Sequence, residues 1–304
     1  MTGLVAPSAW ADEELERQRR VAIAQFIEDR MAEGSASYRA HFAANVVLIE
    51  QLFADTDNLL AFADGAALAA LPPLLQVARY LAAPAISGDD LDTLAGRAIS
   101  DRRRLDPELG RLAAEVILAA VDPERFPWLV ETRPRPPTIE ERGLAIRWTA
   151  GLRAAQQAQM GRRSESAGRQ EAAVRGLLEA HGFEEVARRP ITVGGGLEPG
   201  EFCRETRVVG RKCDVPTRLR DRRFLLLECK VSNSPVNSVK RLNNDVLVKA
   251  GVWRQAFGRT AITAAVLAGV YKLTNLRDAQ EGGVAIFWEH DLAPLVDFLQ
   301  QTSA

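Results

Sequence analysis

The sequence has 304 residues, of which 47% are hydrophobic and 26% are charged, and its net charge is −1. A chain of this length can bury a substantial core, and two domains, or one domain with a large extension, are expected. No apolar segment reaches about twenty residues without a charge or a proline, and Met1 to Glu14 lacks a basic region followed by an apolar run. Export and a membrane span are therefore not expected, and the cytoplasm is the default compartment.

The N-terminal half has the pattern of an all-helical region. Residues from Trp10 to Val130 form successive amphipathic segments rich in Ala and Leu, which are interrupted by prolines. A proline-rich linker follows at Arg133 to Pro137, Thr138 can cap the next helix, and the helical pattern resumes to about Gln159. We therefore predict a helical N-terminal region over residues 1–160.

The pattern changes to mixed helix and strand over residues 161–304. A helix is predicted over Glu165 to His181, and a strand-like segment over Phe183 to Ile191 follows it. The other predicted strands are Arg211–Leu219, Arg223–Val231, Ala261–Val270 and Val284–Trp288, and the other predicted helices are Ser238–Phe257 and Leu292–Gln300. The C-terminal half is therefore expected to be an α/β domain with a mixed central sheet flanked by helices.

Charged residues lie on two successive predicted strands of this domain. Asp214 lies on the first strand. The second strand has four apolar residues, Phe224 to Leu227, directly before Glu228, Cys229 and Lys230. Two carboxylates can hold a hard divalent cation, and a nearby ammonium can orient or deprotonate an attacking water. The pattern predicts a metal-dependent nuclease site, and a purely structural, buried ion pair between Glu228 and Lys230 is the alternative.

Basic residues are concentrated around this predicted site. The stretch from Glu201 to Arg259 contains fourteen Lys/Arg and six Asp/Glu, a net charge of +8 in a chain whose total is −1. Such a field attracts a polyanion, although a solvated basic face is the alternative. Arginine is the cation in the rest of the chain, and all five lysines fall in its last third: Lys212, Lys230, Lys240, Lys249 and Lys272. This use of lysine supports a need for a compact ammonium with an adjustable pKa in that region.

Cysteine use argues against zinc or a disulfide framework. The three cysteines, Cys203, Cys213 and Cys229, are odd in number and lack Cys-x-x-Cys spacing or a nearby pair of histidines.

The order of these features resembles the PD-(D/E)XK nuclease superfamily. A helix bearing Gln170 and Glu171 is followed by the strand with Asp214, the strand ending in Glu228-Cys229-Lys230, a basic helix, a strand and a helix. The proline of that superfamily precedes its aspartate, whereas Pro216 follows Asp214 here. More narrowly, the chain resembles the XamI-type restriction endonucleases, mainly over Glu165 to Leu299. This narrower resemblance is carried by the runs Cys213–Pro216, Leu227–Ser234, Val236–Ser238 and Thr274–Leu276.

This resemblance implies a type II restriction endonuclease with a PD-(D/E)XK core. Asp214 and Glu228 would hold Mg²⁺ with the backbone carbonyl of Cys229, and Lys230 would orient the hydrolytic water and stabilise charge on the phosphorane. Glu171 would hold a metal-bound water or a second ion, and a solvated helix carboxylate is the alternative.

The resemblance also implies contacts with duplex DNA. A polar, basic segment follows the predicted site and would contact bases and phosphates: Asn233, Ser234, Asn237, Ser238, Lys240, Arg241, Asn243 and Asn244. A palindromic target, a homodimer and a cognate DNA methyltransferase as functional companion are expected. The alternatives are a repair or mobile-element nuclease that recognises DNA structure, and a non-catalytic DNA-binding protein.

Overall fold

The computed structural model describes residues 5–33, 35–130 and 132–302, and the chain divides into two compact units. One unit combines the chain up to Ala32 with the chain from Arg162 onward, and the other runs from Glu33 to Gly161. The predicted helical region over residues 1–160 is therefore not one unit in the structure, because its first part, although helical, groups with the C-terminal unit. Helix α1 (Asp12–Glu33) groups with the C-terminal unit because Leu15 and Ala22 are buried in the same apolar cluster as Trp288.

The unit from Glu33 to Gly161 is built from helices around one apolar core. Phe53, Phe126 and Trp128 pack edge to face at its centre, where all three are fully buried. Its helices are α2 (Ala36–Asp55), α3 (Ala66–Ala70), α4 (Pro72–Ala78), α5 (Gly88–Ala95), α6 (Pro107–Ala119), α7 (Pro127–Val130) and the first part of α8 (Ile139–Ala180).

Helix α8 begins with the predicted cap and continues further than predicted. Thr138 Oγ1 accepts a hydrogen bond from the Glu141 N–H at 3.2 Å, and the Glu141 carboxylate accepts one from the Thr138 N–H at 2.7 Å. The helical pattern was expected to end at about Gln159. In the structure the helix does not end there but continues through Gly161 and Gly168, as one helix of 42 residues. A single element therefore contributes to both units.

The unit that contains the predicted site has a six-stranded mixed sheet. The strand order is β1-β2-β5-β6-β7-β8, with β5 antiparallel to β6 and β6, β7 and β8 mutually parallel. The strands are β1 (Glu184–Glu185), β2 (Glu201–Phe202), β5 (Val215–Arg218), β6 (Phe224–Ser232), β7 (Ala261–Gly269) and β8 (Val284–Trp288). The expected mixed sheet is present, although the strand predicted over Phe183–Ile191 is reduced to the two residues of β1.

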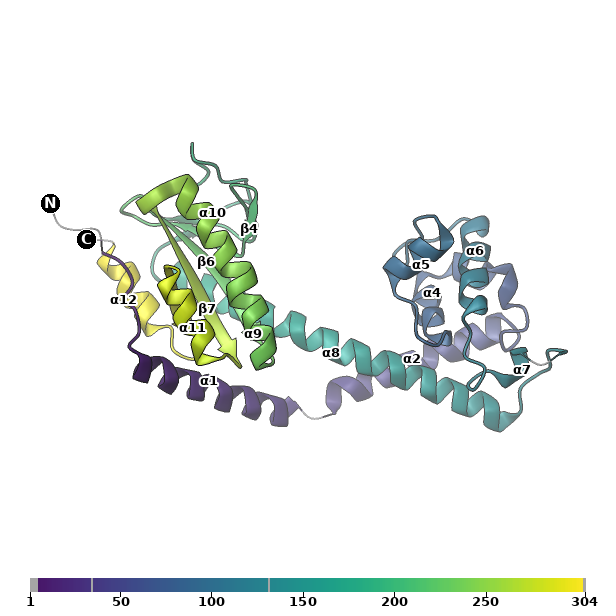
Figure 1. Ribbon diagram of the computed structural model, residues 1–304. Helices are drawn as coiled ribbons and strands as arrows, with labels where there is room; N and C mark the ends of the chain where they lie inside the picture. The colour runs from purple at the N-terminus through teal and green to yellow at the C-terminus, as the bar shows by residue number, and fades with distance from the viewer. Residues whose placement is uncertain (1–4, 34, 131, 303–304) are drawn as a thin grey trace. The chain divides into compact units, whose positions relative to one another are not determined.

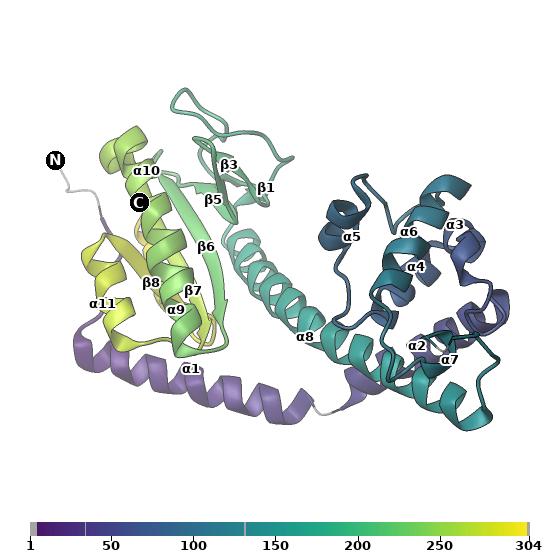
Figure 2. The same ribbon diagram turned by 45° about the vertical axis from the view of Figure 1, so that its right-hand side comes forward.

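Helices cover both faces of this sheet (Figure 1). The later part of α8 and α12 (Ala293–Gln301) pack through Val174, Leu178 and Phe298 against one face. The opposite face carries α10 (Leu247–Phe257), α11 (Leu273–Glu281) and α1. Figure 2 shows α8 and α10 on opposite sides of β6.

The strand predicted over Arg211–Leu219 is two strands in the structure. Strand β4 (Arg211–Cys213) pairs with β3 (Thr206–Val208) in a separate two-stranded sheet, and β5 pairs with β6. The chain bends between them at Asp214. Among the described helices, none is both long enough and apolar enough to cross a membrane.

Candidate active site

Strand β6 is the platform of the candidate site. It is flanked by β5 and β7, and its side chains alternate between the two faces of the sheet. Leu225, Leu227 and Cys229 pack on the α8 face. Glu228 and Lys230 therefore lie on the opposite face, and both are buried. Two buried charges on one face of a central strand require compensation from other residues.

Asp214 provides the first part of that compensation. Its Oδ2 atom accepts hydrogen bonds from the backbone N–H of Cys229 and from Lys230 Nζ, both at 2.8 Å. Lys230 Nζ also lies 2.6 Å from Glu228 Oε2. The structure therefore brings the three predicted residues Asp214, Glu228 and Lys230 into direct contact through one ammonium.

Two residues that sequence reasoning did not assign to the site complete the cluster. Lys249 Nζ lies 2.7 Å from Glu228 Oε2 and 3.1 Å from Asp245 Oδ1. Asp245 Oδ2 is also 3.5 Å from Lys230 Nζ. The sparing use of lysine was a signal for Lys249, whereas nothing in the sequence pattern distinguished Asp245.

The surroundings of Glu228 disfavour the ionised form of its carboxyl group. Glu228 is fully buried, and its Oε1 atom has no hydrogen-bond partner among the residues that the structure describes. Burial, followed by the negative charge of Asp214, raises the pKa of Glu228 to about 6. Leaving a buried acceptor unsatisfied typically costs about 1–3 kcal/mol. Such an oxygen is available to a ligand, because a cation would supply the missing partner.

The two lysines are held in their charged form by the same carboxylates. Burial by itself lowers the pKa of Lys230, but the charges of Asp214 and Glu228 outweigh it and raise that pKa above its usual range. Burial also opposes ionisation of Lys249, and the charge of Glu228 again gives a net raised pKa. The cluster therefore contains three carboxylates facing two ammonium groups.

Helix α8 brings a further carboxylate toward the cluster. Burial, followed by the charges of Asp214 and Glu205, raises the pKa of Glu171, so its carboxylate lies within electrostatic range of Asp214. Its neighbour Gln170 is fully buried, and within the described parts of the chain neither of its side-chain amide atoms has a hydrogen-bond partner. Glu171 thus lies near the site without a direct hydrogen bond to it in the described residues.

The donor set fits a hard cation such as Mg²⁺. Such ions prefer oxygen ligands, and Asp214 and Glu228 supply carboxylates. The buried Oε1 atom of Glu228 is unpartnered in the part of the chain that the structure describes. Within the parts of the chain that the structure describes, no three His, Cys, Asp or Glu side chains come together as a ready-made metal site. A cation here would therefore also need backbone and water oxygens, as Mg²⁺ commonly does.

The polar segment after β6 forms α9 (Pro235–Arg241) and a π-helical segment (Leu242–Val246). Ser234 is the N-cap of α9, where its side chain accepts a hydrogen bond from the Asn237 N–H at 3.3 Å. Exposed side chains on this segment are available to a partner, and those among the predicted DNA contacts are Asn237, Lys240, Arg241 and Asn244; Asn233, Ser234 and Asn243 are partly buried.

Ser238 has a packing role that the sequence did not reveal. It is fully buried, its Oγ donates to the Pro235 carbonyl at 2.6 Å, and it accepts from Asn275 Nδ2 at 2.7 Å. The expectation that Ser238 contacts phosphate differs from this arrangement, because the hydroxyl is enclosed and already paired. The runs Val236–Ser238 and Thr274–Leu276 thus meet in a contact between α9 and α11.

Exposed cations lie on the β3–β4 hairpin, which leads directly into Asp214. Arg207 and Lys212 are cross-strand partners, and Arg211 is opposite Val208. All three basic residues are exposed, although Lys212 pairs with Glu205 at 2.8 Å. Like charges placed directly opposite each other are unfavourable unless an anion compensates them. The hairpin therefore presents positive charge at the edge of the candidate site.

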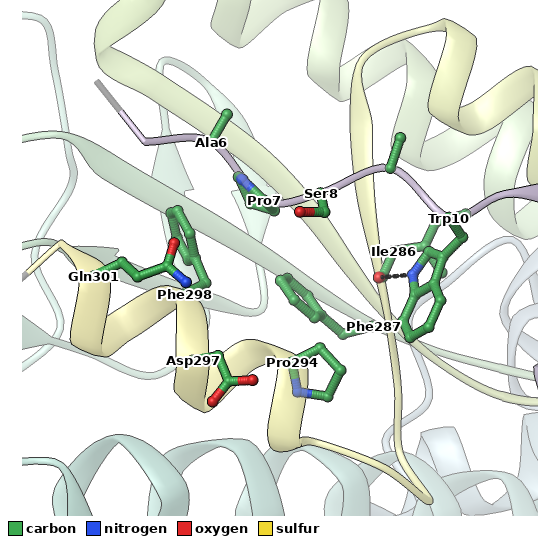
Figure 3. Close-up of a pocket in the computed structure, with 11 residues that line it drawn as sticks. Ala6, Pro7, Ser8, Trp10, Ile286, Phe287, Pro294, Asp297, Phe298 and Gln301 are labelled. Carbon is green, nitrogen blue, oxygen red and sulfur yellow. Dashed lines mark hydrogen bonds between the residues drawn. The ribbon is translucent and has the colours of Figure 1, made fainter. Parts of the chain in front are cut away.

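A cavity of about 260 Å³ shares no lining residue with this cluster (Figure 3). It lies between residues 6–10, β8 and α12. The Trp10 indole N–H donates to the Ile286 carbonyl at 2.7 Å, and the Trp10 backbone exchanges two hydrogen bonds with the Gln280 side chain. This segment therefore covers the outer edge of β8.

Comparison with known proteins decides the family. The sequence model described as XamI restriction endonuclease matches residues 58–288. The type II restriction enzyme XamI of Xanthomonas campestris pv. amaranthicola is 37% identical over 274 residues, which cover 84% of this chain and 95% of that protein. The chain belongs to the XamI restriction endonuclease family.

Restriction endonucleases are site-specific deoxyribonucleases, so the predicted family and class of enzyme are confirmed. The family match begins at residue 58 and thus includes most of the helical unit, whereas the resemblance seen in the sequence lay mainly over Glu165 to Leu299. No solved structure matches this chain.

Proposed function

We propose that this protein is a type II restriction endonuclease that uses Mg²⁺ to hydrolyse phosphodiester bonds at a specific sequence in double-stranded DNA. The observation that carries the proposal is the direct contact of Asp214, Glu228 and Lys230 in a chain of this family. The antiparallel β5–β6 pair, the parallel β7 and a carboxylate on α8 support a PD-(D/E)XK core.

Asp214 and Glu228 would hold the cation. The Cys229 N–H already points to Asp214, on the side of β6 away from its parallel partner β7, and a residue in an extended strand presents its N–H and C=O to the same side. The Cys229 carbonyl therefore supports the predicted third oxygen ligand. The Cys229 thiol has no part in this chemistry, since burial raises its pKa well above the usual range.

Bound Mg²⁺ would polarise the scissile phosphate and lower the pKa of a coordinated water. Lys230 would orient the attacking water with its ammonium and stabilise the charge that develops on the phosphorane. Glu171, with its raised pKa, would accept a hydrogen bond from a water near Asp214. In-line attack of this water would form a new bond from its oxygen to phosphorus and break the bond from phosphorus to the leaving oxygen of the DNA backbone. The proton that the water loses would pass through solvent to the leaving oxygen.

DNA would lie along the exposed cations on both sides of this cluster. Lys240 and Arg241 are exposed near the end of α9, and Arg207 and Arg211 are exposed on the β3–β4 hairpin. Exposed asparagines on the α9 segment, Asn237 and Asn244, have the amide groups that pair with adenine edges. We assign the cations to phosphates and the asparagines to bases.

One chain carries one Asp214, Glu228 and Lys230 set, whereas a palindromic duplex presents two scissile phosphates related by a two-fold axis. A symmetric homodimer on a palindromic site is therefore the simplest assembly. A cognate DNA methyltransferase would protect the host sequence as a functional companion.

The decisive experiment is digestion of a sequenced plasmid with Mg²⁺, followed by mapping of the fragment ends. Discrete fragments with one shared end sequence are expected. Nicking that follows DNA structure would instead indicate a repair or mobile-element nuclease, and binding without cleavage would indicate a non-catalytic DNA-binding protein. Either result would overturn the proposed function.

A further inference from the structure

Asp245 lies in the helices that cover the Glu228 and Lys230 face of β6. It lies in the π-helical segment Leu242–Val246, between α9 and α10. Leu242 and Val246 of this segment are buried in the apolar cluster over the sheet, so the segment is fixed in position. π-Helical turns are rare inside helices and occur frequently at functional sites, where the extra residue redirects side chains.

The extra residue of the π-helical turn allows two sets of contacts at the same time. The apolar side chains of the helix remain against the sheet, while Asp245 and Lys249 both reach the charged end of β6. Asp245 Oδ1 pairs with Lys249 and Asp245 Oδ2 lies 3.5 Å from Lys230 Nζ, so one carboxylate contacts both ammonium groups. Its side chain is 38% exposed, compared with 7% for Lys230.

Lys230 and a cation compete for the same carboxylates. The ammonium now bridges Asp214 Oδ2 and Glu228 Oε2, at 2.8 and 2.6 Å. A divalent cation held by Asp214 and Glu228 would weaken both contacts by repelling the ammonium and by drawing on the same negative charge. Lys230 then needs another anionic partner, and Asp245 Oδ2 is already within ion-pair range.

We propose that Asp245 is the positioning residue of Lys230: it holds the Lys230 ammonium beside the reacting water when Asp214 and Glu228 are engaged with the cation. This inference rests on the proposed function. Lys249 anchors Asp245 from the next helical turn and holds Glu228 Oε2, which leaves Glu228 Oε1 for the cation. The pair Asp245 and Lys249 therefore keeps two groups of the site in place without contacting the reacting atoms.

Two substitutions of opposite charge separate positioning from a general charge effect. Asp245→Asn removes a negative charge and should weaken the binding of Mn²⁺ to the DNA-free protein, measured by calorimetry. Lys249→Met removes a positive charge at nearly the same length, so Mn²⁺ should bind at least as tightly as in the wild type. If the two residues acted through their charge alone, the substitutions would change the affinity for the metal in opposite directions. Any loss of cleavage activity would then disappear at saturating metal.

If Asp245 positions Lys230 and Lys249 anchors Asp245, both substitutions should lower the turnover rate. At saturating Mg²⁺ and duplex, both variants should lower kcat by about 10- to 100-fold, the usual cost of losing such a supporting contact. The KM for DNA should change by less than about threefold. Lys249→Arg, which keeps a cation able to pair with Asp245, should recover part of the lost kcat. Glu281→Gln, which neutralises an exposed acid at the end of α11, is the matched control.

Normal kcat in Asp245→Asn at saturating metal would overturn the role of Asp245, and it would do so even if Lys249→Met failed to fold. Thermal unfolding of each variant identifies such a failure. An inactive wild-type protein would overturn the proposed function together with this inference, whereas an active wild type with unaffected variants would overturn the inference alone.

Discussion

The Asp214 carboxylate accepts a hydrogen bond from the backbone N–H of Cys229 at 2.8 Å, just beyond the last paired residues of β5 and β6, Val215 and Leu227. A side chain thus continues the ladder where the backbone of the first strand turns away. This contact ties the position of Asp214 to the register of β6. A slip of one residue would move Glu228 and Lys230 to the other face of the sheet.

Substitutions within the cluster should abolish cleavage while the protein still binds DNA. Asp214→Asn keeps an acceptor for the Cys229 N–H but removes the charge, and Glu228→Gln and Lys230→Met likewise remove charge at similar volume. Each should reduce plasmid cleavage by several orders of magnitude, because cation binding or water activation is lost. Gel-shift binding should remain. Normal cleavage by any of the three would contradict the assignment, as would full activity in excess chelator.

Cation binding should weaken in mild acid because of Glu228. Burial and the charge of Asp214 raise the pKa of Glu228 from 4.5 to about 6, so this carboxyl takes up a proton as the pH falls through that value. A protonated carboxyl does not ligate Mg²⁺, and the apparent affinity should fall by up to about tenfold per pH unit below about pH 6. Calorimetric titration with Mn²⁺ between about pH 5 and about pH 8 measures this. An affinity that is constant across this range would contradict the prediction.

The cations on α9 should contribute to affinity through phosphate contacts. Lys240→Ala and Arg241→Ala should weaken binding to specific and random duplexes alike, and each should reduce the salt slope by about one. Competition between the mapped site and a random duplex tests this assignment. A change in discrimination would assign these residues to bases, and no change would make this segment a solvated helical surface.

Helix α1 should stabilise the unit that contains the candidate active site, here called the nuclease unit, even though it lies far from the site residues in sequence. Leu15 is fully buried against the sheet-covering cluster, and Leu15→Ala should cost about 2–5 kcal/mol in the free energy of unfolding. Val21→Ala on the same helix is the matched control, because that side chain is 42% exposed. Guanidinium unfolding measures both. Equal stability of the two variants would show that α1 is not part of the folded unit.

Assembly should follow the symmetry of the target. Light scattering of the full chain, with and without a duplex that contains the mapped site, should detect a dimer in the DNA-bound state. The helical unit from Glu33 to Gly161 is a candidate for dimer contacts, because it exposes apolar side chains such as Val47 and Leu94. A protein that stays monomeric in both states, yet cuts both strands in one binding event, would rule out this arrangement.

The sequence by itself was sufficient for the parts that depend on local patterns. Four consecutive apolar residues before Glu228 predicted a buried strand, and the cap at Thr138 marked the start of α8. The sequence also predicted that Asp214, Glu228 and Lys230 form one cluster, because they lie on two successive predicted strands, and the structure brings the three into contact. Their role in metal-dependent hydrolysis stays a prediction.

Only the tertiary structure decided which distant residues join them. Asp245 reaches Lys230 and Lys249 reaches Glu228 because a π-helical segment and the packing of α10 on the sheet fix their direction, and neither effect follows from periodicity. Likewise, α1 belongs to the nuclease unit because Leu15 is buried there, and Ser238 is enclosed because Asn275 from α11 binds it. Local sequence determines which side chains a segment offers, whereas long-range packing determines which of them meet.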